Sequence, residues 1–323
     1  MPVNHLRDLN NIFIGHATNK EAGTGCTVIV CPEGATGGVD VRGGAPATRE
    51  TDLLRPEETV QILNAVILSG GSAYGLAASV GVAEELERRG MGLDVGVGVV
   101  PIVSGACLFD LTCGKADVRP TAEDGVNAVR AAFNEREQPL ERGCVGVGTG
   151  CTVGKLAGME RAMKSGIGEA VENTGKLTVG ALSAVNAAGN VVDPHTLQPI
   201  AGLLSPDKTQ IQDEEQALID QGDNLVMPLE HTNTTISCVV TNAKLTKPQA
   251  TKVAQMAADG YAHAICPTHT SNDGDTIFVM STGDVQAPID LVGTMAMRAI
   301  QGAIVDAVKQ ATSSYGLIAA QDL

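Results

Sequence analysis

The feature that most constrains this chain is the segment 233–242, which reads NTTISCVVTN. A polar Asn-Thr step leads directly into a run rich in Thr, Ile and Val. Branched side chains suit a half-buried pleated surface, so this run predicts a β-strand. Farther along, the polar segment 273–276 (DGDT) leads into a second such run, 277–280 (IFVM). We therefore expect two strands that are each entered through polar residues.

Thr234, at the start of the first strand, has an unusual chemical option. If the bond before it breaks, its new α-amino group lies beside its own hydroxyl, and one residue supplies both nucleophile and base. Ordinary turn chemistry before a strand is the plain alternative. The tripeptide also fits a glycosylation sequon. The segment 1–8 (MPVNHLRD) lacks the cationic start and apolar core of a signal peptide, so we disfavour the sequon.

The composition favours tightly packed layers. Of the 323 residues, 43 % are hydrophobic but only 2 % are aromatic, Trp is absent and Gly reaches 38. This is enough to bury one large core or two moderate ones. Such a core must consist of aliphatic and alanine side chains with close backbone approaches, which suits sheets covered by helices.

Charge and cysteine usage limit the partners and the compartment. The formal net charge is −15 and the sequence pI is near 4.7, so we expect no nucleic-acid partner. We find no apolar run of the roughly 18 residues that a membrane span needs, and expect no membrane partner. The eight cysteines form no Cys-x-x-Cys pair and lie mostly among apolar or glycine residues. Reduced thiols of this kind predict a cytoplasmic protein.

The periodicity of hydrophobic residues and the positions of capping residues, glycine and proline predict the order of the helices and strands. We expect helices that begin after Ser72 and Thr246 as N-caps, with Gly90 ending the first. Strands are expected at 26–31, 65–68, 95–103, 177–187, 235–245 and 277–281, and helices at 73–89, 122–137, 248–264 and 288–311. The polar, acidic stretch 205–222 is the best candidate for an exposed linker. The pattern suggests two sheets covered by helix layers, although periodicity alone does not distinguish this from a doubly wound sheet.

Two glycine-rich segments resemble nucleotide or hydrolase motifs but miss the required spacing. In 146–155 (GVGTGCTVGK), Thr149 stands where a phosphate loop needs its first glycine, and Leu156 follows Lys155 in place of Ser or Thr. Val153 replaces the third glycine of a dinucleotide fingerprint. In 69–75 (SGGSAYG), Tyr74 replaces the last glycine of a nucleophile elbow. We therefore expect no nucleotide cofactor, and a helix start packed through glycines at 69–75.

Two further clusters have ligand-capable side chains. His263, Cys266 and His269 are closely spaced, but no fourth ligand is evident, and a turn at a helix end is the simpler interpretation. Asp273 and Asp275 flank a glycine, so in an extended segment both carboxylates project to the same side. They could form a solvated turn, a divalent-metal pair or a catalytic pair that tunes the pKa of an ammonium or hydroxyl group.

Taken together, the motifs resemble a known family over nearly the whole chain. It is the self-processing aminopeptidase/amidase family, which includes L-aminopeptidase/D-esterases, β-peptidyl aminopeptidases and nylon-oligomer hydrolases. The resemblance rests on 25–29 (GCTVI), 39–44 (VDVRGG), 68–76 (LSGGSAYGL), 148–155 (GTGCTVGK), 185–186 (VN), 233–236 (NTTI) and 273–276 (DGDT). A threonine nucleophile combined with Asp-Gly-Asp is most similar to the nylon-oligomer hydrolase branch.

The resemblance implies a fold, a maturation step and a set of site residues. The fold would be an α/β four-layer α/β/β/α sandwich similar to N-terminal-nucleophile hydrolases, with a different strand connectivity. A single domain, 1–323, would cut itself between Asn233 and Thr234 into fragments 1–233 and 234–323. The active site would hold Thr234 with Lys155, Asn186, Asp273 and Asp275, without cofactor or metal. Asn186 is the candidate oxyanion donor, Lys155 supplies positive charge, and the aspartates hold and polarise Thr234.

The resemblance also sets expectations for substrate and assembly. It implies hydrolysis of small peptides or amides, such as β-peptides, amino amides or ω-amino acid oligomers, by a homo-oligomer, a tetramer of processed heterodimers. One departure concerns Phe109, which stands where the nylon-oligomer hydrolase branch has an active-site tyrosine. Two alternatives remain: an acyltransferase of the ornithine acetyltransferase type, which shares a related fold and also cuts before a threonine, and an inactive binding protein on this fold.

Overall fold

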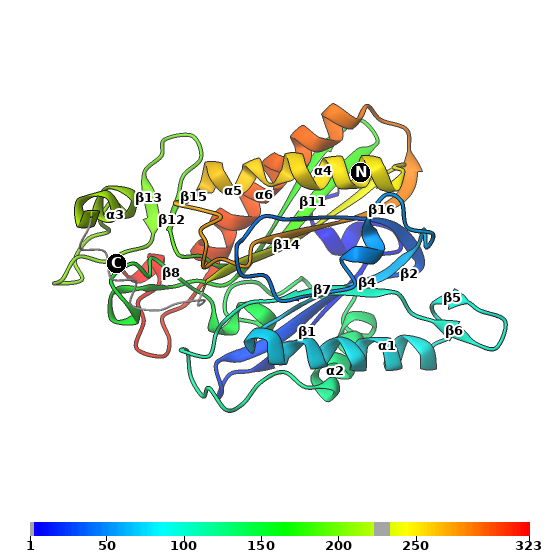
Figure 1. The fold of residues 1–323 in the computed structure, drawn as a ribbon, viewed down its shortest axis with the longest axis horizontal. Coiled ribbons are helices and arrows are strands. Elements are labelled where there is room, and N and C mark those ends of the chain that lie inside the picture. Colours follow the sequence, from blue (N-terminus) through cyan, green and yellow to red (C-terminus); the bar gives the residue numbers. More distant parts are fainter. Residues whose placement is uncertain (1–2, 223–232) are drawn as a thin grey trace.

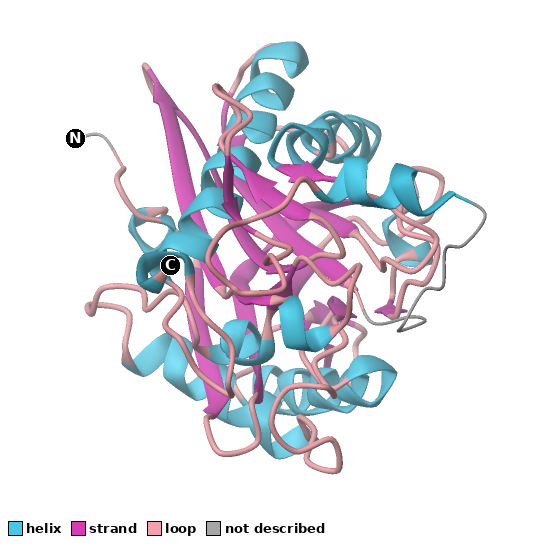
Figure 2. Ribbon diagram, turned by 90° about the vertical axis from the view of Figure 1, so that its left-hand side faces the viewer, coloured by secondary structure: helices cyan, strands magenta, loops and turns pink. Residues whose placement is uncertain are grey.

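The computed structural model describes residues 3–222 and 233–323. Two stacked β-sheets form the centre of the molecule, and helices cover the outer face of each sheet (Figure 1). Figure 2 shows the same arrangement from the side, with the strands lying between groups of helices. The sequence therefore correctly predicted two sheets covered by helix layers.

The first sheet has the strand order β1-β2-β4-β7-β3. The bounds of these strands are Phe13–Asn19, Thr24–Val41, Leu63–Ser69, Val103–Cys107 and Thr48–Arg49. The second sheet has the order β10-β11-β14-β16 and ends on β2. Its strands are Ile167–Thr174, Leu177–Asn186, Thr234–Ala243 and Thr276–Val285. Strands β14 and β16 are parallel, and β11 pairs with β14 antiparallel.

Strand β2 joins the two sheets and differs from expectation. The sequence predicted a strand at 26–31, but β2 continues through Pro32 to Val41. Its first half pairs with β1 and β4, and residues 36–41 pair with β16. The pairing with β4 shifts register between Val30 and Ala35. Proline is tolerated in a strand at such an irregularity, since it has no N–H to donate to a ladder.

Helices complete the four layers. On the first sheet lie α1 and α2, at Ala78–Arg88 and Ala122–Asn134; on the second lie α4, α5 and α6, at Lys247–Ala257, Asp259–Ala264 and Ile289–Gln310. A small sheet of order β13-β12-β15 lies beside α3 (Glu214–Gln221). Its strands are Pro199–Ala201, Asn190–Val192 and Ile265–Cys266. Two short hairpins are β5-β6, at Leu93–Asp94 and Val99–Val100, and β8-β9, at Thr152–Val153 and Met163–Lys164.

Strand β14 shows how the sequence separates the layers. Ile236, Cys238 and Val240 belong to the apolar cluster between the two sheets. Val239, which points the other way, packs with Ile300 of α6 in the cluster beneath the helices. A third cluster lies between the first sheet and the helices α1 and α2. The period-2 alternation of β14 thus supplies two cores from one strand.

Several predicted boundaries were wrong for local reasons. Residues 95–103 are not one strand, because Gly96 and Gly98 adopt positive φ in the turn of the β5-β6 hairpin. The helix expected from residue 73 begins as a 3-10 helix, Ser72–Ala77, and becomes α-helical at Ala78. Ser72 itself has a positive φ and does not cap it. The expected helix 248–264 is divided into α4 and α5.

The stretch 205–222 is mostly exposed, as its composition suggested, but it is not a structureless linker. It contains α3, and Glu214 at the start of this helix is buried. Ser205 is buried as well, and Leu204 forms a β-bridge with Ile211. Polar composition alone therefore predicts the exposure of this segment but not its helix or its two buried residues.

Helix α6 is long and apolar enough to cross a membrane, so the expectation that no such run exists was too strict. Its most apolar window has a mean hydropathy of 1.3, and 61 % of that window is buried inside the protein. The helix packs along β10 and β11. Burial of this kind marks the core helix of a layered domain.

Candidate active site

Thr234 is the first residue of β14 and is only 3 % exposed. Its cross-strand partner on β11 is Asn186. On its other side, Asn233 forms a parallel bridge with Asp273, just before β16 begins. Pairing in the middle of the second sheet thus brings together three segments that are far apart in the sequence, and with them Thr234, Asn186 and Asp273.

The bond between Asn233 and Thr234 is held in a defined geometry. The Thr234 hydroxyl donates a hydrogen bond to the carbonyl oxygen of Asn233. The backbone N–H of Gly274 donates to the same oxygen at 3.1 Å. A Cβ at Gly274 would lie 2.8 Å from Thr234 Oγ1 and 2.9 Å from Ala45 O. The glycine of the Asp-Gly-Asp sequence is therefore required by the close approach of Thr234.

Asp275 accepts hydrogen bonds from the backbone next to Thr234. Its Oδ1 accepts a hydrogen bond from the Thr235 N–H at 2.7 Å. Its Oδ2 accepts from the His269 backbone N–H at 3.1 Å and from the His269 Nδ1–H at 2.8 Å. The sequence predicted that both aspartates hold and polarise Thr234. In the structure, the Asp275 carboxylate accepts a hydrogen bond from the backbone N–H of Thr235, the residue after Thr234.

Asp273 is a buried carboxylate with unequal oxygens. Oδ2 accepts hydrogen bonds from the Thr270 N–H at 2.8 Å and the Thr270 hydroxyl at 2.6 Å. Oδ1 is buried and has no hydrogen-bond partner within the described ranges. Burial and the neighbouring charge of Asp275 raise the pKa of Asp273 to about 6. Asp273, whose backbone bridges to Asn233, therefore retains one buried acceptor without a partner among the described residues.

Lys155 and Asn186 form the other side of the site. Lys155 Nζ donates to the backbone oxygen and to Oδ1 of Asn186, both at 2.9 Å. Burial lowers the pKa of Lys155 to about 8, opposed chiefly by the negative charge of Asp273. The same Asn186 Oδ1 accepts from the Thr152 N–H at 3.0 Å and from the Thr152 hydroxyl at 3.2 Å, so its amide group is oriented by three donors from the 148–155 segment.

Phe109 participates through its backbone. Its carbonyl oxygen accepts a hydrogen bond from Asn186 Nδ2 at 2.8 Å. The next residue, Asp110, is buried and accepts from the Thr24 hydroxyl at 2.6 Å and from the Gly71 N–H at 2.7 Å. Burial raises the pKa of Asp110 to about 6. The motif that resembled a nucleophile elbow thus anchors the loop that orients Asn186.

The sequence analysis named the five candidate site residues but missed several groups that form hydrogen bonds in and around the candidate site. Asp110, Gly274 as a donor, and His269 as a partner of Asp275 were not identified. Asp110 follows directly on Phe109, which was singled out, and this was the only available signal. Among the described residues there is no group of three or more His, Cys, Asp or Glu side chains placed to hold a metal ion. His263 instead contacts Gln301, with 2.6 Å between Nδ1 and Nε2.

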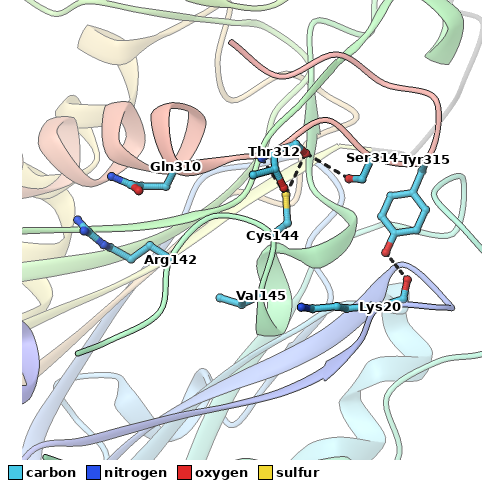
Figure 3. A pocket seen from close by; sticks show the side chains of 8 residues that line it. All are labelled: Lys20, Arg142, Cys144, Val145, Gln310, Thr312, Ser314 and Tyr315. Atoms are coloured by element: carbon cyan, nitrogen blue, oxygen red, sulfur yellow. Dashed lines mark hydrogen bonds between the residues drawn. The ribbon is translucent and has the colours of Figure 1, made fainter. Parts of the chain in front are cut away.

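A separate cavity of about 490 Å³ lies where the C-terminal segment meets the start of the glycine-rich stretch (Figure 3). Cys144 lies in its wall, with Thr312 and Ser314 beside it and the Tyr315 hydroxyl bonded to the Lys20 carbonyl. None of the five predicted site residues lines this cavity.

The model of Peptidase family S58 matches residues 4–323. This chain belongs to peptidase family S58. The family expected from the motifs is therefore confirmed, and this S58 peptidase is a hydrolase that acts on amide or peptide bonds.

Two relatives support the family assignment. An uncharacterized aminopeptidase of Mycobacterium leprae is 40 % identical over 319 residues, which cover 94 % of this chain and 86 % of that protein. A 6-aminohexanoate-oligomer endohydrolase of Paenarthrobacter ureafaciens is 30 % identical over 291 residues, 87 % of this chain and 76 % of that protein.

The structure of the L-aminopeptidase D-Ala-esterase/amidase of Ochrobactrum anthropi is similar with a TM-score of 0.67. It is 18 % identical and covers 99 % of this chain and 91 % of that one. That protein is a serine aminopeptidase with a variant of the Ntn-hydrolase fold. The likeness confirms the predicted fold class.

Proposed function

We propose that this chain is the precursor of a threonine amidohydrolase that cuts itself between Asn233 and Thr234. The observation that carries the proposal is the contact of the Thr234 hydroxyl with the carbonyl of the bond to be broken, while the Gly274 N–H donates to the same oxygen. Cleavage would divide the single domain into fragments 1–233 and 234–323, with Thr234 as a new N-terminus.

Self-cleavage needs a base before the α-amine of Thr234 exists. Lys155 is our candidate, because its Nζ contacts Asn186, the cross-strand partner of Thr234, and burial brings its pKa to about 8. Thr234 Oγ bonds to the carbonyl carbon of Asn233 as its proton passes to Lys155. Negative charge develops on the carbonyl oxygen, where the Gly274 N–H stabilises it. The C–N bond breaks, the nitrogen takes the proton, and water hydrolyses the ester.

Turnover reuses the same hydroxyl. The freed α-amine, with an ordinary pKa of roughly 7.7–8.0, serves as base. Thr234 attacks the substrate amide and forms an acyl-enzyme, which water resolves. Asn186 is the candidate oxyanion donor, a role whose loss typically costs about 10²–10³ in rate. Asp273 Oδ1 has no hydrogen-bond partner among the described residues, and we assign it the role of acceptor for the new ammonium group of Thr234.

The substrate class we propose is small peptides and amides. In support, one relative is named an aminopeptidase and another a 6-aminohexanoate-oligomer endohydrolase. These names favour hydrolysis over the acyltransferase alternative. We further propose a cytoplasmic tetramer of processed heterodimers without a nucleic-acid partner, which agrees with the net charge of −15 and with eight free cysteines.

Substitution of Thr234 tests the proposal. Thr234→Ala removes the attacking oxygen and should abolish both cleavage and hydrolysis. Thr234→Ser keeps a hydroxyl and should retain part of both. Intact mass and N-terminal sequencing of the wild type should show two fragments, with threonine heading the smaller one. Only full-length chain in a fully active wild-type sample would overturn the proposal.

A further inference from the structure

A cavity of about 450 Å³ lies between the small sheet β13-β12-β15 and the start of α3. Its lining includes the aliphatic side chains of Val192, Leu197 and Ile211. It also includes three acidic residues, Asp213, Glu214 and Glu215. The cavity thus combines an apolar surface with carboxylates, which is a suitable environment for an alkyl chain that ends in a positive charge.

Glu214 is not an ordinary surface carboxylate. It is only 3 % exposed, and its Oε1 accepts a hydrogen bond from the Leu156 N–H at 2.9 Å. Its Oε2 is buried without a hydrogen-bond partner in the part of the chain that the structure describes. A buried polar atom that lacks a partner is costly, so a retained one suggests that a ligand supplies the partner.

The cavity shares two segments with the candidate active site. Leu156, which contacts Glu214, directly follows Lys155. Cys266, in the cavity wall, is two residues from Thr268, whose hydroxyl donates to Asp275 Oδ2 at 3.3 Å. The two sites therefore lie on the same pieces of backbone, as expected for a reaction centre and its substrate pocket.

We propose that this cavity is the subsite for a primary aliphatic amine of the substrate, whose ammonium group binds Glu214 and whose methylene groups lie along Val192 and Leu197. The inference rests on the proposed amidohydrolase function and specifies how that enzyme selects its substrate. Glu214 is thus a specificity-determining residue.

Binding of the amine is coupled to loss of a proton. Burial raises the pKa of Glu214 to about 8, opposed by the Leu156 N–H and the charge of Lys155 and reinforced by Asp273. Glu214 is therefore protonated at neutral pH in the empty cavity, whereas an ammonium ligand needs the carboxylate. Affinity should rise about tenfold per pH unit below pH 8 and level off between about pH 8 and the pKa of the amine, near 10.

Calorimetric titration of the processed protein with hexylamine tests this directly. We expect binding to the wild type with the pH dependence above. Glu214→Gln keeps the acceptor for Leu156 and resembles the protonated side chain, so it should fold normally. It should weaken binding at pH 8 by roughly ten- to a hundred-fold and remove the pH dependence below pH 8. Glu137→Gln, at an exposed glutamate after α2, is the control and should bind as the wild type does.

Two results would overturn the inference: equal hexylamine affinity in Glu214→Gln and wild type, or equal affinity of the wild type for hexanol and hexylamine.

Hydrolysis is then measured separately on an aminohexanoyl anilide and its N-acetyl form. Glu214→Gln should raise KM for the first only and leave kcat nearly unchanged. Amine binding without any hydrolysis would contradict the proposed function but would still support the amine subsite. Hydrolysis without an amine preference that depends on Glu214 would support the proposed function but contradict the subsite.

Discussion

Lys155 and Asp273 control each other's protonation in the buried site. Burial penalises the charged form of both groups, lowering the pKa of the lysine to about 8 and raising that of the aspartate to about 6. Their opposite charges partly offset these shifts, since the Asp273 carboxylate favours the ammonium form of Lys155. The proposed base is therefore poised near working pH by two opposing effects.

This balance predicts the pH dependence of self-cleavage. If neutral Lys155 accepts the Thr234 proton, the rate should rise with pH and level off above about pH 8. Asp273→Asn removes the charge that favours the ammonium form, so the pKa of Lys155 falls and the rise moves to lower pH. The rates can be followed by electrophoresis of freshly synthesised precursor at a series of pH values.

Two controls keep this prediction specific to Lys155. Lys155→Met removes the amine, so the pH-dependent rise near pH 8 should disappear along with most of the rate. Glu137→Gln changes an exposed charge and should leave the profile in place. An unshifted rise in Asp273→Asn would assign the titration to another group.

At the scale of elements, the loop that precedes β16 is as important as the strand that carries Thr234. Gly274 places its N–H on the Asn233 carbonyl because no Cβ stands between them. Gly274→Ala would put a methyl group 2.8 Å from Thr234 Oγ1. Displacement of the hydroxyl should slow self-cleavage by about 10²-fold, since small misplacements of reacting atoms have large effects on rate.

The half-life of the Gly274→Ala precursor, measured beside circular dichroism to confirm folding, checks this expectation. Val97→Ala is a suitable control, because the Val97 side chain is 98 % exposed in the turn of the β5-β6 hairpin, which lies apart from Thr234. A Gly274→Ala precursor that matures at the wild-type rate would remove Gly274 from the mechanism.

The sequence predicted the bounds of helices and strands well where the whole segment packs in one environment. Strand β11 and helix α6 agree with the predicted 177–187 and 288–311 to within one residue at each end. Prediction failed where neighbours in space override local pattern. Strand β2 passes through Pro32 because it serves two sheets, and Glu214 is buried because α3 packs against the Leu156 segment.

At the scale of the whole molecule, long-range contacts also limited what the sequence could predict about the candidate active site. Thr234, Lys155, Asn186, Asp273 and Asp275 were identified as a set through motif resemblance, and the fold brings their segments together. Their supporting groups could not be found in this way. Asp110 contacts Thr24 and Gly71, which are 86 and 39 residues away, and no local pattern encodes contacts over such separations.

The layered architecture also predicts what happens to the molecule after cleavage. The proposed fragment 234–323 contributes β14 and β16 to the middle of the second sheet, between β11 and β2. It also contributes α4 and α6, which pack against β2, β10 and β11 of the other fragment. Because each fragment would expose much of the shared apolar core on separation, neither should be stable alone.

Native mass spectrometry of the matured protein should show both fragments in one species. In a urea titration, they should separate only at the concentration where circular dichroism reports loss of the sheet; release of folded 234–323 below that concentration would contradict the argument.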